Sequence, residues 1–266
     1  MNTEIERDWE AIRAQQPLVH NITNYVVMNS TANALLAAGA SPVMAHAIEE
    51  VEEMVRLSGA LVINIGTLSR PWINAMRIAR QAAAEAGIPV VLDPVGAGAT
   101  RLRTETVRQF LAEAPPTVLR GNASEILALH EDREKTKGVD SRHQPAAARD
   151  AARALARHYG CVVCVSGEID LILDQQRALH VMNGHPLMPR VTGLGCTASA
   201  LTGAFLAVNR NSLEASANAM AVLGIAGEIA GEKAAGPGSL QMYLLDTLYQ
   251  LDSATLRHRL RMTDAG

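Results

Sequence analysis

Short apolar runs alternate with longer amphipathic stretches along most of the chain. The apolar runs are rich in Val, Ile and Leu and span residues 41–45, 60–66, 88–93, 116–121, 161–167 and 170–183. Helix-length segments separate most of them, so consecutive strands should run parallel, and a parallel sheet is covered by helices on both faces. The pattern predicts an α/β fold, a central mostly parallel sheet with helices on both faces, in one domain spanning residues 1–266.

Three segments of the pattern allow more specific predictions. The run at 170–183 divides into two short apolar pieces separated by a few polar residues, which predicts an antiparallel hairpin at a sheet edge. The segment 47–57 has its apolar residues on one helical face and its glutamates mostly elsewhere. From about residue 196 the chain should be helical, with breaks at Gly231 and at 236–238.

Composition and charge exclude several classes of protein. Hydrophobic residues make up 48% of the chain and charged residues 19%, which is typical of a globular protein. A net charge of -3 and 3% aromatic residues give neither a basic field nor a stacking surface for nucleic acid. The N-terminus lacks a secretory pattern and no long apolar run suggests a membrane span. We expect a cytoplasmic protein in which the polar stretch 130–144 is a surface excursion.

The three cysteines do not form a disulfide framework, because they are sparse and odd in number. Cys161 and Cys164 spell C-x-x-C within the predicted strand 161–167, where residues three apart point to opposite faces. No second pair or nearby histidine completes a zinc site. We interpret both as packed core thiols.

Polar residues follow several of the predicted strands. Ligands of open parallel sheets bind beyond the carboxyl ends of the strands, so these positions are candidate site residues. They are Asp93 in VVLDPVGAGA, Arg120 and Glu125 in VLRGNASE, and Ser166 in VCVSGE. Asp93 and Glu125 could hold a hydrated magnesium ion together with nucleotide phosphates. Taken singly, each could instead be a turn or helix cap, and Arg120 a surface ion pair.

The segment VTGLGCTAS places two glycines before a predicted helix. Gly193 and Gly195 permit close backbone approach, and the free N–H groups of a helix start favour an anion such as phosphate. A tight turn needs glycines for steric reasons as often, so the glycines alone do not decide between a turn and a phosphate site. The P-loop pattern, the G-x-G-x-x-G pattern after the first strand and the G-x-S-x-G pattern are absent.

Six segments together resemble the hydroxyethylthiazole kinase family of the ribokinase-like superfamily. They occur in family order between residues 17 and 235 and read HNITNYVVMNSTANALLAAGASPVMA, NIGTL, VVLDPVGAGAT, LRGNASEI, VSGEID and VTGLGC. The resemblance implies ATP-dependent phosphorylation of the hydroxyl of 4-methyl-5-(2-hydroxyethyl)thiazole, a step of thiamine salvage. It also implies a ribokinase-like fold and a homotrimer with substrate pockets between subunits.

The resemblance assigns roles to individual residues. Asn24, Met44 and Gly193 would contact the thiazole alcohol. Arg120 and Ser166 would contact ATP, although a threonine is expected where Ser166 stands. Asp93 and Glu125 would serve magnesium and phosphate.

Cys196 occupies the place where many ribokinase-like enzymes carry the aspartate of G-x-G-D, the base for the substrate hydroxyl. A helix start can lower a thiol pKa, so we expect partial thiolate character. Alternatives are another ribokinase-like kinase, for a hydroxymethylpyrimidine or a sugar, and a binding module without catalysis. A cysteine-dependent acyl transferase or hydrolase would need a base for Cys196. His20 is the nearest candidate, although a histidine in a turn is more often exposed.

Overall fold

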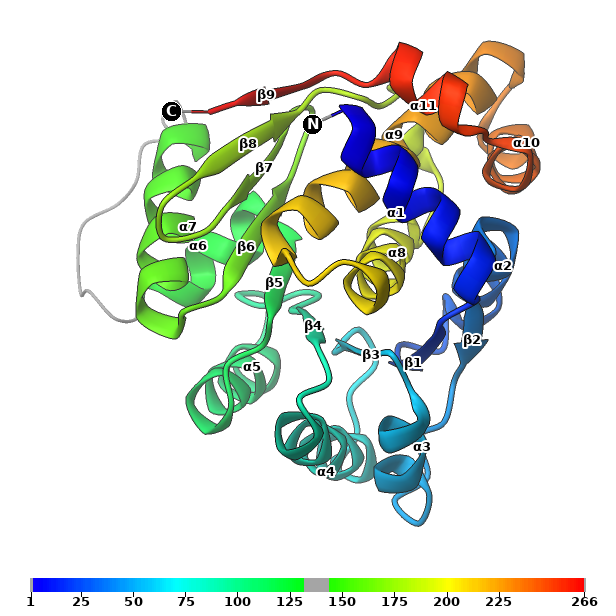
Figure 1. Cartoon of the computed structure of the whole chain (residues 1–266). Helices are drawn as coiled ribbons and strands as arrows, with labels where there is room; N and C mark the ends of the chain where they lie inside the picture. Colours follow the sequence, from blue (N-terminus) through cyan, green and yellow to red (C-terminus); the bar gives the residue numbers. More distant parts are fainter. Residues whose placement is uncertain (1, 132–143, 266) are drawn as a thin grey trace.

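The computed structural model describes residues 2–131 and 144–265. Most of the predicted surface excursion at 130–144 lies outside the described residues. The central sheet has nine strands in the order β2-β1-β3-β4-β5-β6-β7-β8-β9, and Figure 1 shows it with helices packed around it. Helices cover both of its faces, as predicted from the alternation of apolar runs.

Six neighbouring strands run parallel. They are β2 (Ser41–Val43), β1 (Leu18–Ile22), β3 (Ala60–Asn64), β4 (Val90–Asp93), β5 (Val118–Asn122) and β6 (Val162–Ser166). Strand β1 was not predicted, because its sequence LVHNI mixes apolar with polar residues. All but one of its residues are nevertheless buried. Its insertion between β2 and β3 brings the loop that follows it to the carboxyl end of the sheet.

The remaining strands are antiparallel. β7 (Asp170–Leu173) and β8 (Ala178–Val181) form the predicted hairpin, with Leu171 opposite His180. The prediction that this hairpin lies at the sheet edge is wrong, because β9 (Met262–Asp264) pairs outside β8. A three-residue strand near the end of the chain is too short to show a periodic pattern.

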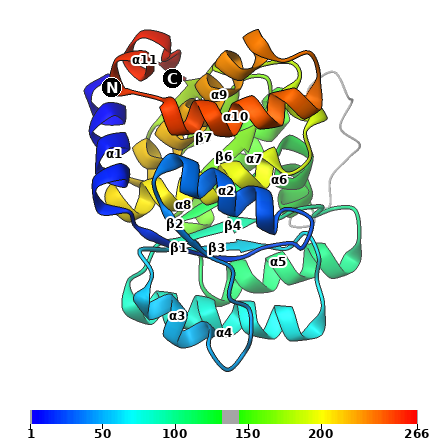
Figure 2. The same ribbon diagram turned by 90° about the vertical axis from the view of Figure 1, so that its right-hand side faces the viewer.

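One face of the sheet is covered by helices from both ends of the chain (Figure 2). These are α1 (Asn2–Gln15), α2 (Met28–Ala38), α8 (Leu194–Val208), α9 (Ser212–Lys233), α10 (Pro237–Gln250) and α11 (Ser253–Arg259). A short 3-10 helix, η2 (Met188–Arg190), precedes α8. A break occurs next to the predicted position 236–238, at residues 234–236 between α9 and α10. Gly231 is not a break but lies inside α9, where a Cβ would come within 2.5 Å of the His185 ring.

The other face is covered by the middle of the chain. Its helices are α3 (Val51–Leu57), α4 (Arg70–Ala86), α5 (Arg101–Glu113), α6 (Ala123–Glu131) and α7 (Gln144–Tyr159). The helix predicted at 47–57 begins only at Val51. Helix α4 shows why such segments fold locally, because the Ser69 hydroxyl accepts from the Trp72 amide at its start and Gly87 ends it at φ 67°.

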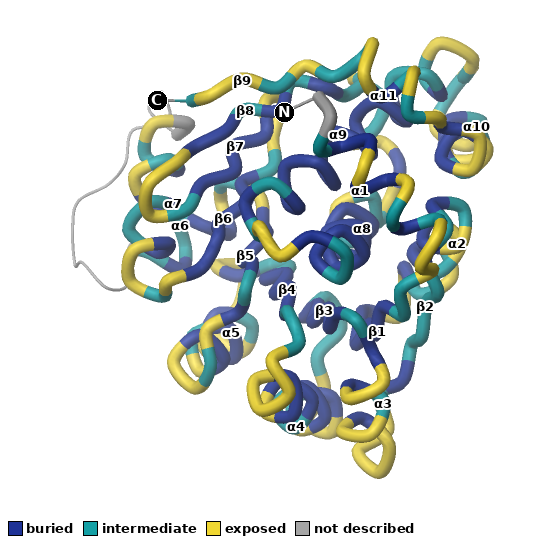
Figure 3. The backbone as a smooth tube through the Cα atoms, viewed as in Figure 1, coloured by how far each residue is buried: buried dark blue, intermediate teal, exposed yellow. Residues whose placement is uncertain are grey.

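Helix α8 is buried against the sheet, as its dark tube in Figure 3 shows. It packs closely because its residues are small, and a Cβ at Gly203 would lie 2.8 Å from the Val62 side chain. Helix α8 contacts β3 and β4, and hydrogen bonds that join its first turns to Asn64 and Asp93 place its N-terminus at the carboxyl ends of these strands. This packing places the segment VTGLGC beside the ends of the central strands.

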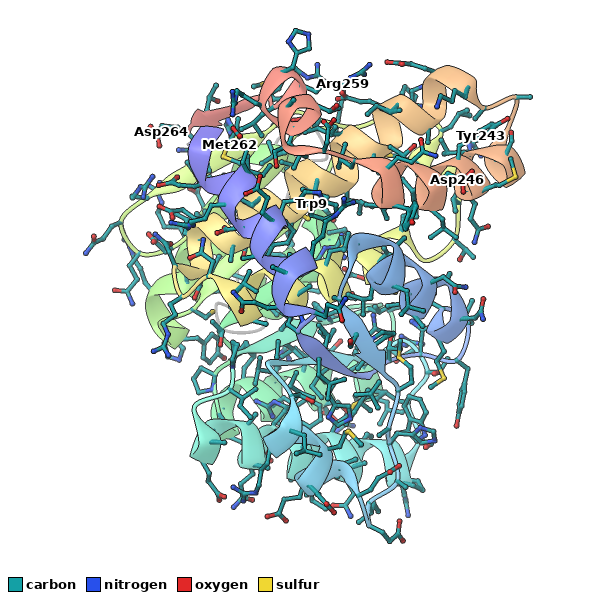
Figure 4. The ribbon with its side chains drawn as sticks, turned by 45° about the vertical axis from the view of Figure 1, so that its right-hand side comes forward. Trp9, Tyr243, Asp246, Arg259, Met262 and Asp264 are labelled. Carbon is teal, nitrogen blue, oxygen red and sulfur yellow. The ribbon has the colours of Figure 1, made fainter. Side chains whose placement is uncertain are left out.

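Helix α1 and the strand cysteines contribute to the core. Trp9, labelled on α1 in Figure 4, donates its indole N–H to the carbonyl of Leu251 at 2.9 Å. Cys161 and Cys164 are buried in the clusters on opposite faces of the sheet, as predicted. Burial raises the pKa of both thiols to about 12.

Among the described residues, we find no helix with the length and apolar character needed to cross a membrane.

Candidate active site

The polar residues predicted from the strand ends lie together at the carboxyl end of the sheet. Asp93 ends β4, and Arg120 lies in β5 with Ser166 at the end of the neighbouring β6. The parallel register accounts for this clustering, because it sets strand ends side by side. The ladder places Asn64 of β3 opposite Asp93, and Asn122 of β5 opposite Ser166.

Asp93 is a buried carboxylate with three polar neighbours. Its Oδ2 accepts from Ser199 Oγ at 2.7 Å and from Asn64 Nδ2 at 3.0 Å, and lies 3.7 Å from Arg120 Nη1. Burial, together with the nearby charge of Glu125, raises the Asp93 pKa to about 6 against the opposing effect of Arg120 and the two hydrogen bonds. These contacts connect β3, β4, β5 and α8, so Asp93 does more than cap the turn before Pro94.

Arg120 is a buried cation beneath the N-terminus of α8. Its side chain is only 8% exposed, and Nη2 donates to Ser166 Oγ at 2.9 Å. A Cβ at Gly195 would lie 3.1 Å from Arg120 Nη1, which explains the need for a small residue there. The buried Nε has no hydrogen-bond partner among the described residues. Burial lowers the Arg120 pKa, but the nearby charges of Asp93, Cys164, Asp170 and Cys196 together outweigh it, so the pKa is raised.

Glu125 lies in the first turn of α6 and is buried. Its Oε1 accepts from the amide of Gly96 and its Oε2 from the amide of Asn122, both at 2.8 Å. The carboxylate therefore connects the loop after β4 to the end of β5. Glu125 is therefore an acid in the first turn of a helix, which is one of the two interpretations given from the sequence. Its carboxylate also lies beside the strand ends.

Cys196 lies in the first turn of α8, after Gly193, which caps the helix at φ 84°. Its sulfur accepts from Asn64 Nδ2 at 3.1 Å and from Asn24 Nδ2 at 3.4 Å. The expected thiolate character is wrong for this structure. Burial and the charge of Asp93 raise the Cys196 pKa to about 11, although the two amides and Arg120 act in the opposite direction.

The residues assigned to substrate divide into two groups. Asn24 contacts both Cys196 and Asn64 and so belongs to the cluster. A Cβ at Gly193 would come within 2.5 Å of Val27, so this glycine is needed where the loop after β1 meets α8. Met44 directly follows β2, the outermost parallel strand, and lies two strands away from β3.

His20 does not supply a base for Cys196. It is fully buried in β1, where Nε2 lies 2.7 Å from the carbonyl of Ala45, and burial lowers its pKa. His20 was expected to be an exposed turn residue. This is wrong because the strand that buries it, β1, mixes apolar with polar residues and was not predicted. The hydrogen-bond partners described for the Cys196 sulfur are two asparagines, so the histidine-activated hydrolase loses its support.

Comparison with known proteins identifies the family. Residues 9–254 match the model of the Hydroxyethylthiazole kinase family. A protein named hydroxyethylthiazole kinase from Syntrophus aciditrophicus is 59% identical over 97% of each chain. The solved structure of hydroxyethylthiazole kinase protein from Pyrococcus horikoshii OT3 is 45% identical, with a TM-score of 0.93 over 99% of this chain and 100% of that one. The chain belongs to the hydroxyethylthiazole kinase family.

Membership of the hydroxyethylthiazole kinase family confirms the resemblance and the predicted fold class. A more distant neighbour supports the same fold. The structure of the pyridoxal kinase from Staphylococcus aureus in complex with pyridoxal has a TM-score of 0.67 at 16% identity, over 93% of this chain and 97% of that one.

Three residues of the site were not found from the sequence. Asn64 ends an apolar strand within NIGTL, and Ser199 follows Cys196 by three positions on α8. Asp170 begins β7, accepts from the Gly167 amide at 2.9 Å and interacts with the Arg120 charge. A buried polar residue at the end of an apolar run was the available signal for Asn64. The two others depend on which elements pack together.

Proposed function

We propose that this chain transfers the terminal phosphoryl group of ATP to the hydroxyl of 4-methyl-5-(2-hydroxyethyl)thiazole. The observation that carries the proposal is the buried Arg120, placed between Asp93 and Ser166 beneath the glycine-rich start of α8. Phosphoryl transfer depends mainly on positioning and on stabilisation of charge on the phosphoryl oxygens. A buried guanidinium and a free helix N-terminus supply both.

The proposed donor side consists of Arg120, Ser166 and the N-terminus of α8. Arg120 Nη1 lies beside Gly195, so the guanidinium and the start of α8 can meet the same phosphate group. Asp93 and Glu125 would hold Mg²⁺, which typically binds through one or two carboxylates together with waters and phosphates. The described residues contain no cluster of three or more ionisable ligands that could hold a metal alone. This donor set therefore suits an ion that arrives with the nucleotide.

The proposed acceptor side consists of Asn24, Met44, Gly193 and Cys196. Asn24 donates a hydrogen bond to the Cys196 sulfur, so the two residues can contact the same substrate group. We place the substrate hydroxyl there, beside the sulfur. Cys196 occupies the position of a base, but its high pKa keeps it a neutral thiol near pH 7 in the free protein. Its contribution would be to position the alcohol, and the hydroxyl proton would pass to an oxygen of the transferred phosphoryl group as the new P–O bond forms.

A homotrimer with active sites between subunits is part of the proposal. Met44 follows an edge strand, where a neighbouring subunit could meet it. Several large apolar side chains near this side of the fold are exposed, as expected for a surface that another subunit covers. They are Tyr25, Val26 and Leu36 around α2, and Met242 and Tyr249 on α10, which packs beside α2. We also place the protein in the cytoplasm, where ATP is supplied.

Incubation with Mg²⁺, ATP and the thiazole alcohol tests this function. We expect ADP and the thiazole phosphate in equal amounts, detected by mass spectrometry, and neither above background when a chelator replaces Mg²⁺. A hydroxymethylpyrimidine, a sugar and pyridoxal serve as competing acceptors under the same conditions. Preferred transfer to one of these, or ligand binding without any transfer, would contradict the proposal.

A further inference from the structure

Asn64 lies between the two sides of the proposed site. It is the last residue of β3, is 1% exposed, and pairs across the ladder with Asp93. It belongs neither to the residues assigned to substrate nor to those assigned to ATP or metal. Its side chain nevertheless contacts one member of each set.

All four hydrogen-bonding positions of the Asn64 carboxamide are used. Its Oδ1 accepts from the Gly66 amide at 2.9 Å and from Asn24 Nδ2 at 3.0 Å. Its Nδ2 donates to Asp93 Oδ2 at 3.0 Å and to Cys196 Sγ at 3.1 Å. A carboxamide offers two donors and two acceptor lone pairs, so the group is saturated. A backbone amide can only donate, so the contact with Gly66 fixes which end of the carboxamide carries oxygen.

The fixed orientation determines how the Cys196 thiol is presented. Asn64 and Asn24 both direct an amide hydrogen at the sulfur, so the thiol hydrogen cannot lie along either contact. It must point away from the two asparagines. The sulfur is thereby held at a defined place, and the same nitrogen of Asn64 holds the Asp93 carboxylate.

We propose that Asn64 is a positioning residue, whose donor edge sets the placement of Cys196 relative to Asp93 and so aligns the acceptor alcohol with the phosphoryl donor. The inference rests on the proposed function. It gives Asn64 a role in the chemical step, through two other residues, without requiring that it touch a substrate. Misplacement of reacting groups by about 1 Å can cost about 10² in rate, which sets the size of effect to look for.

Two substitutions separate this role from a merely structural one. Asn64→Leu has a similar size and removes both the donor and the acceptor edge. Asn64→Asp keeps an oxygen toward Gly66 and Asn24 but replaces the donor nitrogen that faces Asp93 and Cys196. Asn74→Leu is the matched control, because Asn74 is an exposed amide on α4, a helix outside the proposed subunit interface of α2 and α10.

Steady-state kinetics with the thiazole alcohol and Mg²⁺-ATP, alongside thermal unfolding, provide the test. We expect both Asn64 variants to lose about 10- to 100-fold in kcat, with KM for the alcohol changed by less than about threefold. Asn74→Leu should match the wild type in kcat and KM. A lower unfolding temperature with unchanged kcat, or a raised KM with unchanged kcat, would overturn the proposal. Asn64→Asp carries the same test should Asn64→Leu fail to fold.

A double-mutant cycle tests whether Asn64 acts through Cys196. In a Cys196→Ala background, Asn64→Leu should cost clearly less in kcat than it does in the wild type, because part of its target is gone. Ser199→Ala removes a donor from Asp93 without touching the sulfur, so its effect should stay additive with Cys196→Ala. Full additivity of Asn64→Leu would overturn the proposal. A wild-type chain that transfers nothing to the alcohol would instead refute the proposed function.

Discussion

The two ends of the central strands carry opposite kinds of feature. The amino end is hollow, with cavities of ≈ 570 Å³ and ≈ 690 Å³ that share Pro115, Thr117 and Ser212. The carboxyl end carries the buried cluster of Asp93, Arg120 and Cys196. Buried charge and hydrogen bonding, rather than these cavities, place the site at the carboxyl end.

The two buried arginines show why the charge is the better guide. Arg80, at the amino end, donates to the carbonyls of Phe110 and Ala114. Its guanidinium carbon also lies 4.5 Å from the centre of the Phe110 ring. Those carbonyls belong to the end of α5, so Arg80 serves a helix C-terminus. Arg120, at the other end, faces a carboxylate, a hydroxyl and a helix N-terminus. Both Nε atoms lack a hydrogen-bond partner among the described residues, so the two arginines differ in what their guanidinium groups face. Arg80 completes a helix end, whereas Arg120 lies among groups that suit a phosphate ligand.

The largest effect at the carboxyl end is expected from the carboxylates. Asp93→Asn and Glu125→Gln should each lower kcat/KM about 10²- to 10³-fold, because each removes charge from the proposed magnesium and phosphate site. The free energy of unfolding of Asp93→Asn should change much less than its kcat/KM, since burial already disfavours the charged form of Asp93. Activity assays across a magnesium titration check this. Glu105→Gln, in an exposed pair with Arg101, is the control, and full activity of either site variant would contradict the assignment.

A smaller effect is expected at Cys196. Cys196→Ala should lower kcat about 10- to 100-fold without abolishing transfer, because the glycine turn and helix N-terminus remain. Cys196→Asp should retain or raise activity, since a carboxylate also accepts the two amide hydrogen bonds from Asn24 and Asn64. Rate measurements on both variants decide. Two inactive variants and a covalent adduct on Cys196 during turnover would show a nucleophile instead.

The raised thiol pKa predicts slow alkylation. With a pKa of about 11, the thiolate fraction of Cys196 should grow about tenfold per pH unit between pH 7 and 10. The rate of iodoacetamide labelling should follow it without a plateau, and Cys196→Ala should remove this labelling. A plateau near pH 7 would restore the lowered pKa expected from the helix start alone.

The smallest effect concerns stability and Asp170. Burial raises its pKa to about 6 in the folded chain, so protonation below that pKa favours the folded state. Its contribution is fully present below the unfolded pKa of about 4 and is lost as the pH rises through about 6. Between pH 7 and 4 the free energy of unfolding of the wild type should rise relative to Asp170→Asn by on the order of 2 kcal/mol. Chemical denaturation at both pH values measures this difference, and parallel pH profiles would contradict it.

Sequence patterns predicted the parts of the site that depend on strand direction. Asp93, Arg120 and Ser166 follow apolar runs, and parallel strands bring such positions together. The helix covering those strands could not be assigned to them from periodicity, so Ser199 and the burial of Cys196 were missed. Burial raises the pKa of the Cys196 thiol, whereas the helix start alone predicted a lowered pKa. His20 and β1 were missed because polar residues inside a central strand resemble a turn until their partners are known.

The central claim, that the site lies at the carboxyl end of the sheet, is tested most directly by comparing the two buried arginines. We would measure kcat/KM with the thiazole alcohol, and thermal unfolding, for Arg120→Met and Arg80→Met. Arg120→Met should lose at least about 10² in kcat/KM. Arg80→Met should lose about 1–3 kcal/mol of stability by leaving helix carbonyls unpaired, with kcat/KM within about threefold at a temperature where it is folded. Retained activity in Arg120→Met, or an equal loss in folded Arg80→Met, would contradict a site at the carboxyl end.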